Sequence, residues 1–231
     1  MTIRSPRRAA SYIIDHSVAY SYPILLDLAG KLVVIVGGGR AAVRKAEGLI
    51  EGGATKVRCI APEIEQEMPA EVEKINTRFV PSHLDGAALV FAATSSAETN
   101  IDVVRAARER SILVARVGSE GDVGDFVVPA NWRTGQIIVS VSTGSPTLSK
   151  TLRDEIEASI ISIDKYAEMA ELMLKLRPWL LNSALPPSQR LEALFDLARR
   201  PALDALAQGG GEGLYRWLVE RYPELKLEKA P

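Results

Sequence analysis

The sequence places three consecutive glycines, Gly37, Gly38 and Gly39, directly after the apolar run Leu32–Val36. Ala42 then completes a G-x-G-x-x-A pattern with Gly37 and Gly39, and apolar residues recur at helical spacing beyond it. In nucleotide-binding α/β proteins the first glycine permits a tight turn, the second lets the backbone approach a pyrophosphate, and the small third residue keeps helix and strand close. N–H groups at the start of the helix also attract phosphates. The pattern predicts a dinucleotide site, and a tight turn without a ligand is the alternative.

The end of the second predicted strand lacks the acid that often holds the ribose of a dinucleotide. That strand covers residues 56–60 and is followed by Ala61 and Pro62, with Glu63 one residue further on. We therefore expect the adenosine to be held by backbone groups or by Glu63. Arg40, just inside the glycine turn, either meets the pyrophosphate or is a solvated residue at the helix start.

Other kinds of catalytic centre find no support in the sequence. His16, His83 and Cys59 lie far apart and lack the spacing of metal ligands, so we expect no permanent metal site. The chain contains neither the G-x-S-x-G motif of many hydrolases nor the lysine motif of a phosphate-binding loop. These observations argue against hydrolase and kinase functions.

The composition indicates a globular protein of one or two domains, with 231 residues, 47% of them hydrophobic and 25% charged. A net charge of −1 gives no general attraction to nucleic acid or to anionic membranes. No run reaches the ~20 apolar residues of a membrane span. The single cysteine excludes an intrachain disulfide, which favours a cytoplasmic location. Residues 1–20 are basic without a sustained apolar region, and we expect an N-terminal arm rather than a signal peptide.

Short apolar runs alternate with helical patterns through the first half of the chain. This alternation predicts an α/β fold, a Rossmann-like, doubly wound parallel sheet that forms a domain over residues 21–124. The predicted strands are Leu32–Val36, Lys56–Ile60, Thr77–Val80, Leu89–Ala93 and Ile112–Val117.

The pattern changes after Gly118. Residues 126–129 and 136–142 are predicted strands outside the sheet, joined through residues 131–135, and they form a small β element over residues 125–150. Pro146 suits the first turn of a following helix, and residues 151–231 are predicted to form a helical domain. We expect a helix break near Asp164 and a flexible joint at residues 209–211. An apolar stripe runs along the helix that begins this domain: Leu148, Leu152, Ile156, Ile160 and Ile163.

Several segments in order resemble the precorrin-2 dehydrogenase family, the amino-terminal modules of siroheme synthases. They read YPILLDLAGKLVVIVGGGRAAVRKAEGLIEGGA, VRCIAPE, LVFAATS, ILVARV, DFVVPA and VSTGSPTLSKTLRDEIE, and together they cover roughly residues 20–160. The resemblance implies a Rossmann unit that binds NAD, a β element that supports a homodimer, and a helical tail that completes a tetrapyrrole cleft. It implies oxidation of precorrin-2 to sirohydrochlorin, with hydride passing to NAD⁺. Some members of the family then insert ferrous iron.

The resemblance also assigns site residues. Thr143, Gly144 and Ser145 match a substrate turn whose N–H and hydroxyl groups could receive a propionate, although a capping role alone explains Ser145 equally well. The expected cofactor-binding residues are Gly37, Gly38, Gly39, Arg40, Ala41, Ala61, Pro62, Thr94 and Ser95.

The catalytic carboxylate is the largest departure from the family. Members commonly read N-V-V-D after the strand in which this chain has Ala115-Arg116-Val117-Gly118. The loop that follows contains Asp122 and Asp125, and we take Asp122 as the hypothetical proton acceptor. Asp125 is the second candidate, with structural hydrogen bonding as its alternative. Two rival functions stay open: a non-catalytic module that binds NAD or tetrapyrrole and regulates a partner, and a dehydrogenase for a different small substrate.

Overall fold

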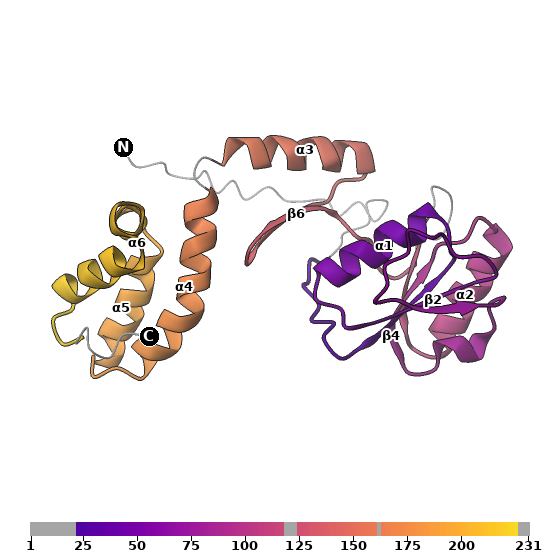
Figure 1. The fold of residues 1–231 in the computed structure, drawn as a ribbon, viewed down its shortest axis with the longest axis horizontal. Coiled ribbons are helices and arrows are strands. Elements are labelled where there is room, and N and C mark those ends of the chain that lie inside the picture. The colour runs from indigo at the N-terminus through magenta and orange to yellow at the C-terminus, as the bar shows by residue number, and fades with distance from the viewer. Residues whose placement is uncertain (1–21, 118–123, 161–162, 226–231) are drawn as a thin grey trace, which may run out of the picture. The chain divides into compact units, whose positions relative to one another are not determined.

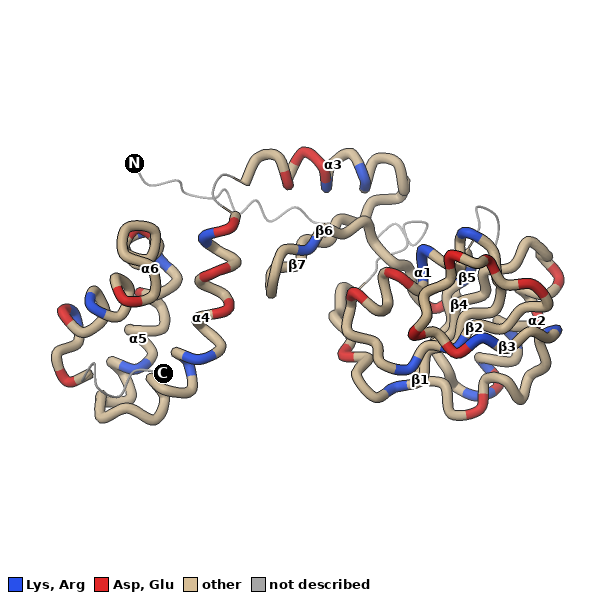
Figure 2. The backbone as a smooth tube through the Cα atoms, in the orientation of Figure 1, with Lys and Arg blue, Asp and Glu red and all other residues tan. Residues whose placement is uncertain are grey.

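The computed structural model describes residues 22–117, 124–160 and 163–225. The chain divides into two compact units, the first ending at Val127 and the second beginning at Val128. Charged residues of both signs are interspersed along both units (Figure 2). Among the described helices none is long and apolar enough to cross a membrane.

The first unit contains a parallel sheet with helices packed against it (Figure 1). Its five strands lie in the order β3-β2-β1-β4-β5. Because the chain moves outward from β1 to β3 and then returns to β4 beside β1, the ends of β1 and β4 form the switch point at which such sheets bind ligands. The predicted fold class is confirmed. The elements of this unit are β1 (Leu32–Val36), α1 (Arg40–Glu51), β2 (Lys56–Ala61), β3 (Glu73–Asn76), the short 3₁₀ helix η1 (Pro81–Leu84), β4 (Ala87–Ala92), α2 (Ala97–Glu109) and β5 (Leu113–Arg116).

Helices cover both faces of the sheet. On one face Val33 and Ile35 pack in a buried cluster with the apolar side of α1, and on the other Val34 and Val36 pack with α2. Successive residues of a strand point to opposite faces, so a strand covered on both sides must be apolar throughout. This requirement explains the unbroken apolar run of β1.

The third strand lies earlier than the sequence pattern predicts. We expected Thr77–Val80, whereas β3 covers Glu73–Asn76 and pairs with β2 at the edge of the sheet. Three of its four residues are exposed, so the strand carries no apolar pattern. The apolar Phe79 instead packs against the α2 face of the core from outside any strand.

The second unit begins with an antiparallel hairpin, β6 (Ala130–Thr134) and β7 (Ile137–Val141). The predicted strand over residues 126–129 is therefore wrong, as is the predicted connection through residues 131–135. Pro129 cannot donate to a strand ladder, and Phe126 packs edge-on against Phe91 of the first unit at 5.5 Å. The strand accordingly starts after the proline.

Four helices follow the hairpin, namely α3 (Pro146–Ser159), α4 (Ile163–Leu181), α5 (Pro187–Leu197) and α6 (Arg200–Arg221). The predicted break near Asp164 is found as the end of α3 at Ser159 and the start of α4 at Ile163. The predicted joint is a kink inside α6, where Gly210 has a φ of 58°. Buried Leu176, Leu197 and Leu214 show that α4, α5 and α6 share one core.

Candidate functional site

The glycine turn is held between β1 and the chain that follows β2. The Gly37 N–H donates to the Ile60 carbonyl at 2.9 Å, and the Glu65 N–H donates to the Gly38 carbonyl at 2.9 Å. The buried Cys59 thiol lies 3.2 Å from the Gly37 carbonyl oxygen. These contacts fix the turn at the carboxyl edge of the sheet.

Two of the three glycines are required by close backbone contacts. Gly37 has a φ of +124°, and a Cβ at this position would lie 2.3 Å from the Ala93 carbonyl oxygen. A Cβ at Gly38 would lie 2.0 Å from the carbonyl oxygen of Glu63. Gly39 differs, because its φ is −84° and a Cβ there would have no heavy atom within 4 Å. The third glycine therefore borders open space, as the backbone approach of a pyrophosphate requires.

The start of α1 offers hydrogen-bond donors to that space. Gly39 is the N-cap residue of α1 and has no side chain that could accept a hydrogen bond from the helix N–H groups, and the first turn of α1 contains no acidic residue. The first N–H groups of a helix have no intrahelical acceptor, and here they belong to Arg40 and Ala41. Arg40 is exposed. The donors and the positive end of the helix dipole fit the phosphates of a dinucleotide.

The end of β2 brings no carboxylate of its own. Ala61 is 6% exposed and packs toward Gly38, while Pro62 and Glu63 are exposed. The buried alanine leaves the glycine turn close to the strand. Contact of Ala61 and Pro62 with the adenosine stays a prediction.

The turn after β4 lies beside the glycine turn, since Ala93 N donates to the Val36 carbonyl at 2.7 Å. The Thr94 hydroxyl bonds the Ser96 carbonyl and the Asn100 amide oxygen at 3.0 and 2.8 Å, and Ser96 caps α2 through Thr99 N. Asn100 is 4% exposed and also accepts from the Thr94 N–H at 3.1 Å. Sequence reasoning missed Asn100. Exposed Ser95 lies at the tip of this turn.

The predicted substrate turn before α3 repeats this arrangement. The Thr143 hydroxyl donates to the Ser145 carbonyl at 2.7 Å and lies 2.9 Å from the buried Ser149 hydroxyl. The Thr143 N–H donates to Ser149 Oγ at 2.9 Å, and Ser145 Oγ accepts from Leu148 N at 3.4 Å. We call both arrangements the Thr-x-Ser cap: Thr94, Ser96 and Asn100 in one unit, and Thr143, Ser145 and Ser149 in the other. The hydroxyls of the second cap bond within the turn, so the capping role of Ser145 is observed.

Of the two candidate carboxylates, Asp125 lies within the described residues and Asp122 lies outside them, as does Gly118. The Asp125 carboxylate accepts from Val114 N and from Arg108 Nε, both at 3.1 Å. The Asp125 N–H also donates to the Val114 carbonyl at 2.7 Å. These contacts attach the residue to the outer edge of β5.

Other titratable groups border the site without matching a metal centre. Lys45 of α1 lies 5.7 Å from the centre of the Phe91 ring, and burial together with the nearby Arg44 lowers its pKa. Burial raises the pKa of Cys59 to about 11, so the thiol stays protonated at neutral pH. Within residues 22–117, 124–160 and 163–225, no group of His, Cys, Asp and Glu side chains is arranged to hold a metal ion.

Comparison with known families matches residues 24–130 to the family described as "Putative NAD(P)-binding". Siroheme synthase 1 of Pectobacterium atrosepticum is 35% identical over 218 residues, which are 90% of this chain and 45% of that protein. The siroheme synthase of Photorhabdus laumondii is 35% identical over 147 residues, covering 61% of this chain and 31% of its own length. The chain thus spans less than half the length of these relatives.

Among solved structures, one described as "SirC, precorrin-2 dehydrogenase" shares the fold with a TM-score of 0.69 at 21% identity, covering 87% of this chain and all of that one. The shared fold includes most of both units. The chain is therefore similar in sequence to a siroheme synthase along nine-tenths of its length, and it shares the fold of SirC.

Proposed function

We propose that the protein oxidises precorrin-2 to sirohydrochlorin with NAD⁺, in the synthesis of siroheme. The observation that carries the proposal is the glycine turn, whose open side at Gly39 faces the donors of α1, in a chain that aligns along nine-tenths of its length with a siroheme synthase. A dinucleotide site alone would fit many dehydrogenases. The alignment with a siroheme synthase supports a tetrapyrrole as the substrate.

We propose that the cofactor lies along the carboxyl edge of the sheet. The backbone at Gly39, Arg40 and Ala41 would bind the pyrophosphate, and Ala61 with Pro62 would lie against the adenosine. The turn at Thr94 and Ser95 follows the neighbouring β4 and would border the nicotinamide end. Bound NAD⁺ supplies the hydride acceptor.

The substrate must lose a proton as well as a hydride. We assign Asp122 as the proton acceptor, because it lies in the loop between β5 and Asp125. Asp125, the second candidate, already binds Val114 N and Arg108, and these contacts suit anchoring of the loop better than proton transfer. At the start of α3, the Thr143 and Ser145 hydroxyls bond within the turn, so backbone N–H groups around Gly144 would receive a propionate.

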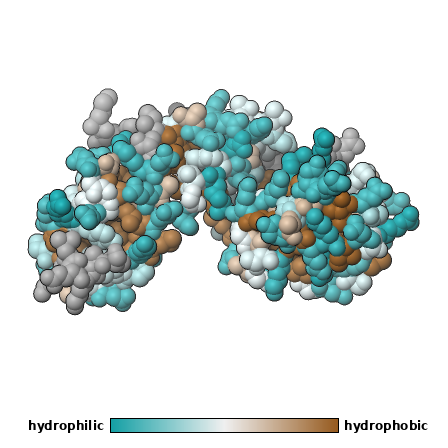
Figure 3. Space-filling view, in the orientation of Figure 1, coloured by the Kyte–Doolittle hydropathy of each residue, from teal (hydrophilic) through white to brown (hydrophobic). Residues whose placement is uncertain are grey.

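We further propose that the protein is a cytoplasmic homodimer. Ser149 is the one buried residue that α3 contributes, whereas Leu148 is 50% and Ile156 is 37% exposed. Apolar residues reach the surface in both units (Figure 3). A symmetric contact between two copies would cover the stripe on α3. Sedimentation that shows only monomer at micromolar concentration would overturn the homodimer.

One observation favours a second candidate function, a non-catalytic NAD- or tetrapyrrole-binding module that regulates a partner. Gly118 stands where family members commonly carry the aspartate proposed as catalytic. A module that has lost this carboxylate would bind its ligands without turnover.

The deciding experiment mixes purified protein with precorrin-2 and NAD⁺ and follows NADH and sirohydrochlorin by absorbance. Stoichiometric appearance of both products supports the proposed function. Saturable NAD⁺ binding without oxidation of precorrin-2 would support the regulatory module instead. Absence of NAD⁺ binding would overturn the proposed oxidation and would leave only a module that binds tetrapyrrole. Addition of ferrous iron to the completed reaction tests metal insertion separately.

A further inference from the structure

A cavity of about 380 Å³ lies beside the sheet's edge strand, away from the glycine turn. It opens where α2 packs against β5, so one wall is helix and the other is the end of the strand. Its lining combines two aliphatic side chains, three arginines and one acid: Ile101, Val104, Arg105, Arg108, Arg116 and Glu109.

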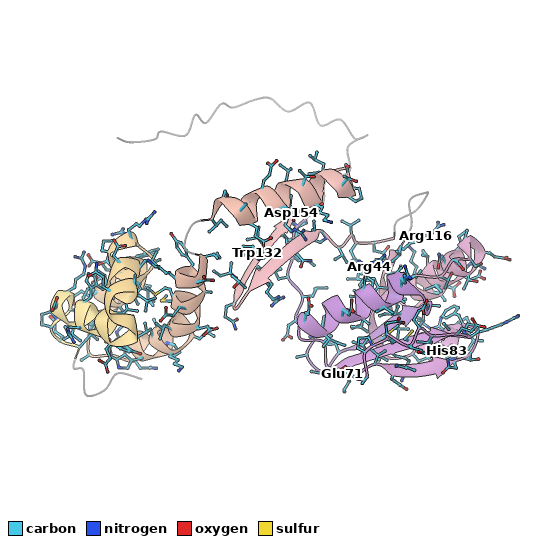
Figure 4. All side chains as sticks on the ribbon, turned by 45° about the horizontal axis from the view of Figure 1, so that its top comes forward. Arg44, Glu71, His83, Arg116, Trp132 and Asp154 are labelled. Carbon is cyan, nitrogen blue, oxygen red and sulfur yellow. The ribbon has the colours of Figure 1, made fainter. Side chains whose placement is uncertain are left out.

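Arg116, labelled in Figure 4, is the last residue of β5 and lines this cavity. Its Nε is buried and has no hydrogen-bond partner within the described part of the chain. A buried N–H of a charged group that makes no hydrogen bond is costly, and native proteins rarely keep one without a reason. A guanidinium has five donors arranged to bind a carboxylate or phosphate through two parallel bonds.

The other two arginines of the cavity are paired with acids, whereas Arg116 forms no ion pair among the described residues. Arg105 pairs with Asp102, and Arg108 pairs with Asp125 at 3.1 Å. Glu109 also lines the cavity, but no ion pair joins it to Arg116 among the residues described. The cavity therefore holds one arginine without an ion pair among the described residues, next to the apolar walls of Ile101 and Val104.

We propose that this cavity is a binding site for a small organic anion, whose carboxylate pairs with Arg116 while its apolar part contacts Ile101 and Val104. Hydrogen bonds to a charged partner are strong where water is partly excluded, and a planar carboxylate matches the guanidinium fork. The proposal does not depend on the oxidation of precorrin-2.

Calorimetric titration of the full chain with benzoate, and separately with inorganic phosphate, tests the site at low ionic strength. We expect saturable binding of benzoate, and we expect Arg116→Gln to weaken it at least tenfold. Arg110→Gln is the matched control, because Arg110 is an exposed arginine near the same helix end that pairs with Asp85 and does not line the cavity. Circular dichroism establishes that each variant is folded.

Should Arg116→Gln fail to fold, Arg116→Lys replaces it, since lysine keeps the charge and loses the planar fork. Weaker benzoate binding by the lysine variant supports the proposal. Binding of phosphate but not benzoate would overturn the organic anion as ligand. No saturable binding to the unmodified protein, or equal weakening by Arg110→Gln, would overturn the site.

Discussion

Replacement of Gly39 by valine separates cofactor binding from folding. A Cβ at Gly39 would have no heavy atom within 4 Å, and its φ of −84° and ψ of −174° lie in the extended region that valine favours. The folded protein therefore has room for the new side chain. A bound pyrophosphate would compete for the same space, so we expect NAD⁺ affinity to fall at least tenfold, which corresponds to about 1.4 kcal/mol.

Substitution of the neighbouring Gly38 should have the opposite effect. At Gly38 a Cβ would lie 2.0 Å from the Glu63 carbonyl oxygen, well inside the 3.4 Å at which ordinary contact begins. Gly38→Ala must therefore displace the backbone after β2, at about 1–3 kcal/mol of unfolding free energy. Substitution at Gly39 should change affinity with little loss of stability, and substitution at Gly38 should lower stability itself.

Gly48 provides the matched control, since it lies on the same helix, is exposed, and has the same open space around a Cβ. Calorimetric titration with NAD⁺ and thermal unfolding of Gly39→Val, Gly38→Ala and Gly48→Val form the complete experiment. Unchanged NAD⁺ affinity in Gly39→Val, or an equal loss in Gly48→Val, would remove the glycine turn from the cofactor site.

Three further predictions concern other parts of the chain. Asp122→Asn should lower turnover of precorrin-2 roughly a hundredfold, with NAD⁺ affinity nearly unchanged, and a variant that reacts at the parental rate would exclude this carboxylate as the base. Asp196 is 3% exposed, and its carboxylate accepts hydrogen bonds from Arg199 Nη1 and Tyr222 Oη, both at 2.9 Å, and from Arg221. Asp196→Ala should therefore lower the free energy of unfolding by about 2–3 kcal/mol, as measured by denaturant unfolding. Burial alone would raise the pKa of Asp196, but the bonds from Arg221 and Tyr222 hold it below its usual value. The ionised Asp196 therefore stabilises the fold at pH values above the pKa of the unfolded state, and this stabilisation is lost as the pH falls through the pKa of the folded state. The stability of Asp196→Asn should accordingly depend less on pH in the acid range than the stability of the parent protein. Ile156→Glu on the exposed stripe should shift a dimer to monomer in sedimentation, whereas Glu157→Gln, at the neighbouring exposed polar position of α3, should leave the dimer intact.

The glycine turn could be predicted from sequence because strand, turn and helix are consecutive, and each has a local signal. A parallel strand that is covered on both faces must be apolar throughout. Only glycine fits at positions 37 and 38, because a Cβ there would lie 2.3 Å from the Ala93 carbonyl oxygen and 2.0 Å from that of Glu63. The edge strand β3 had no such signal. Its position is set by pairing with β2, from Arg58 beside Glu73 to Ala61 beside Asn76, and three of its four side chains are exposed.

The polar contacts that hold the site turns could not be read from periodicity. Asn100 and Ser149 are buried polar residues on helices, and each is recognised only together with the threonine six residues before it. Asp196 and Tyr222 meet across 26 residues of sequence, so only the packing of α5 against α6 joins them. The Thr-x-Ser cap is found in each of the two units within the described residues, and this repetition is the sequence signal that could have identified its members.

The contacts that complete the core of the helical unit also affect the order in which the two units fold during synthesis. Tyr222 and Leu225 are buried, at 6% and 2% exposure, so the core shared by α4, α5 and α6 is incomplete until the chain reaches Leu225. Among the described residues, those that form the two cores of the parallel sheet all lie before Val127. At usual elongation rates roughly 5 to 20 s separate these two points, so on the ribosome the dinucleotide unit can be folded while the apolar faces of α4 and α5 are still uncovered. During that interval the nascent helices, rather than the sheet, are the segments that need a chaperone.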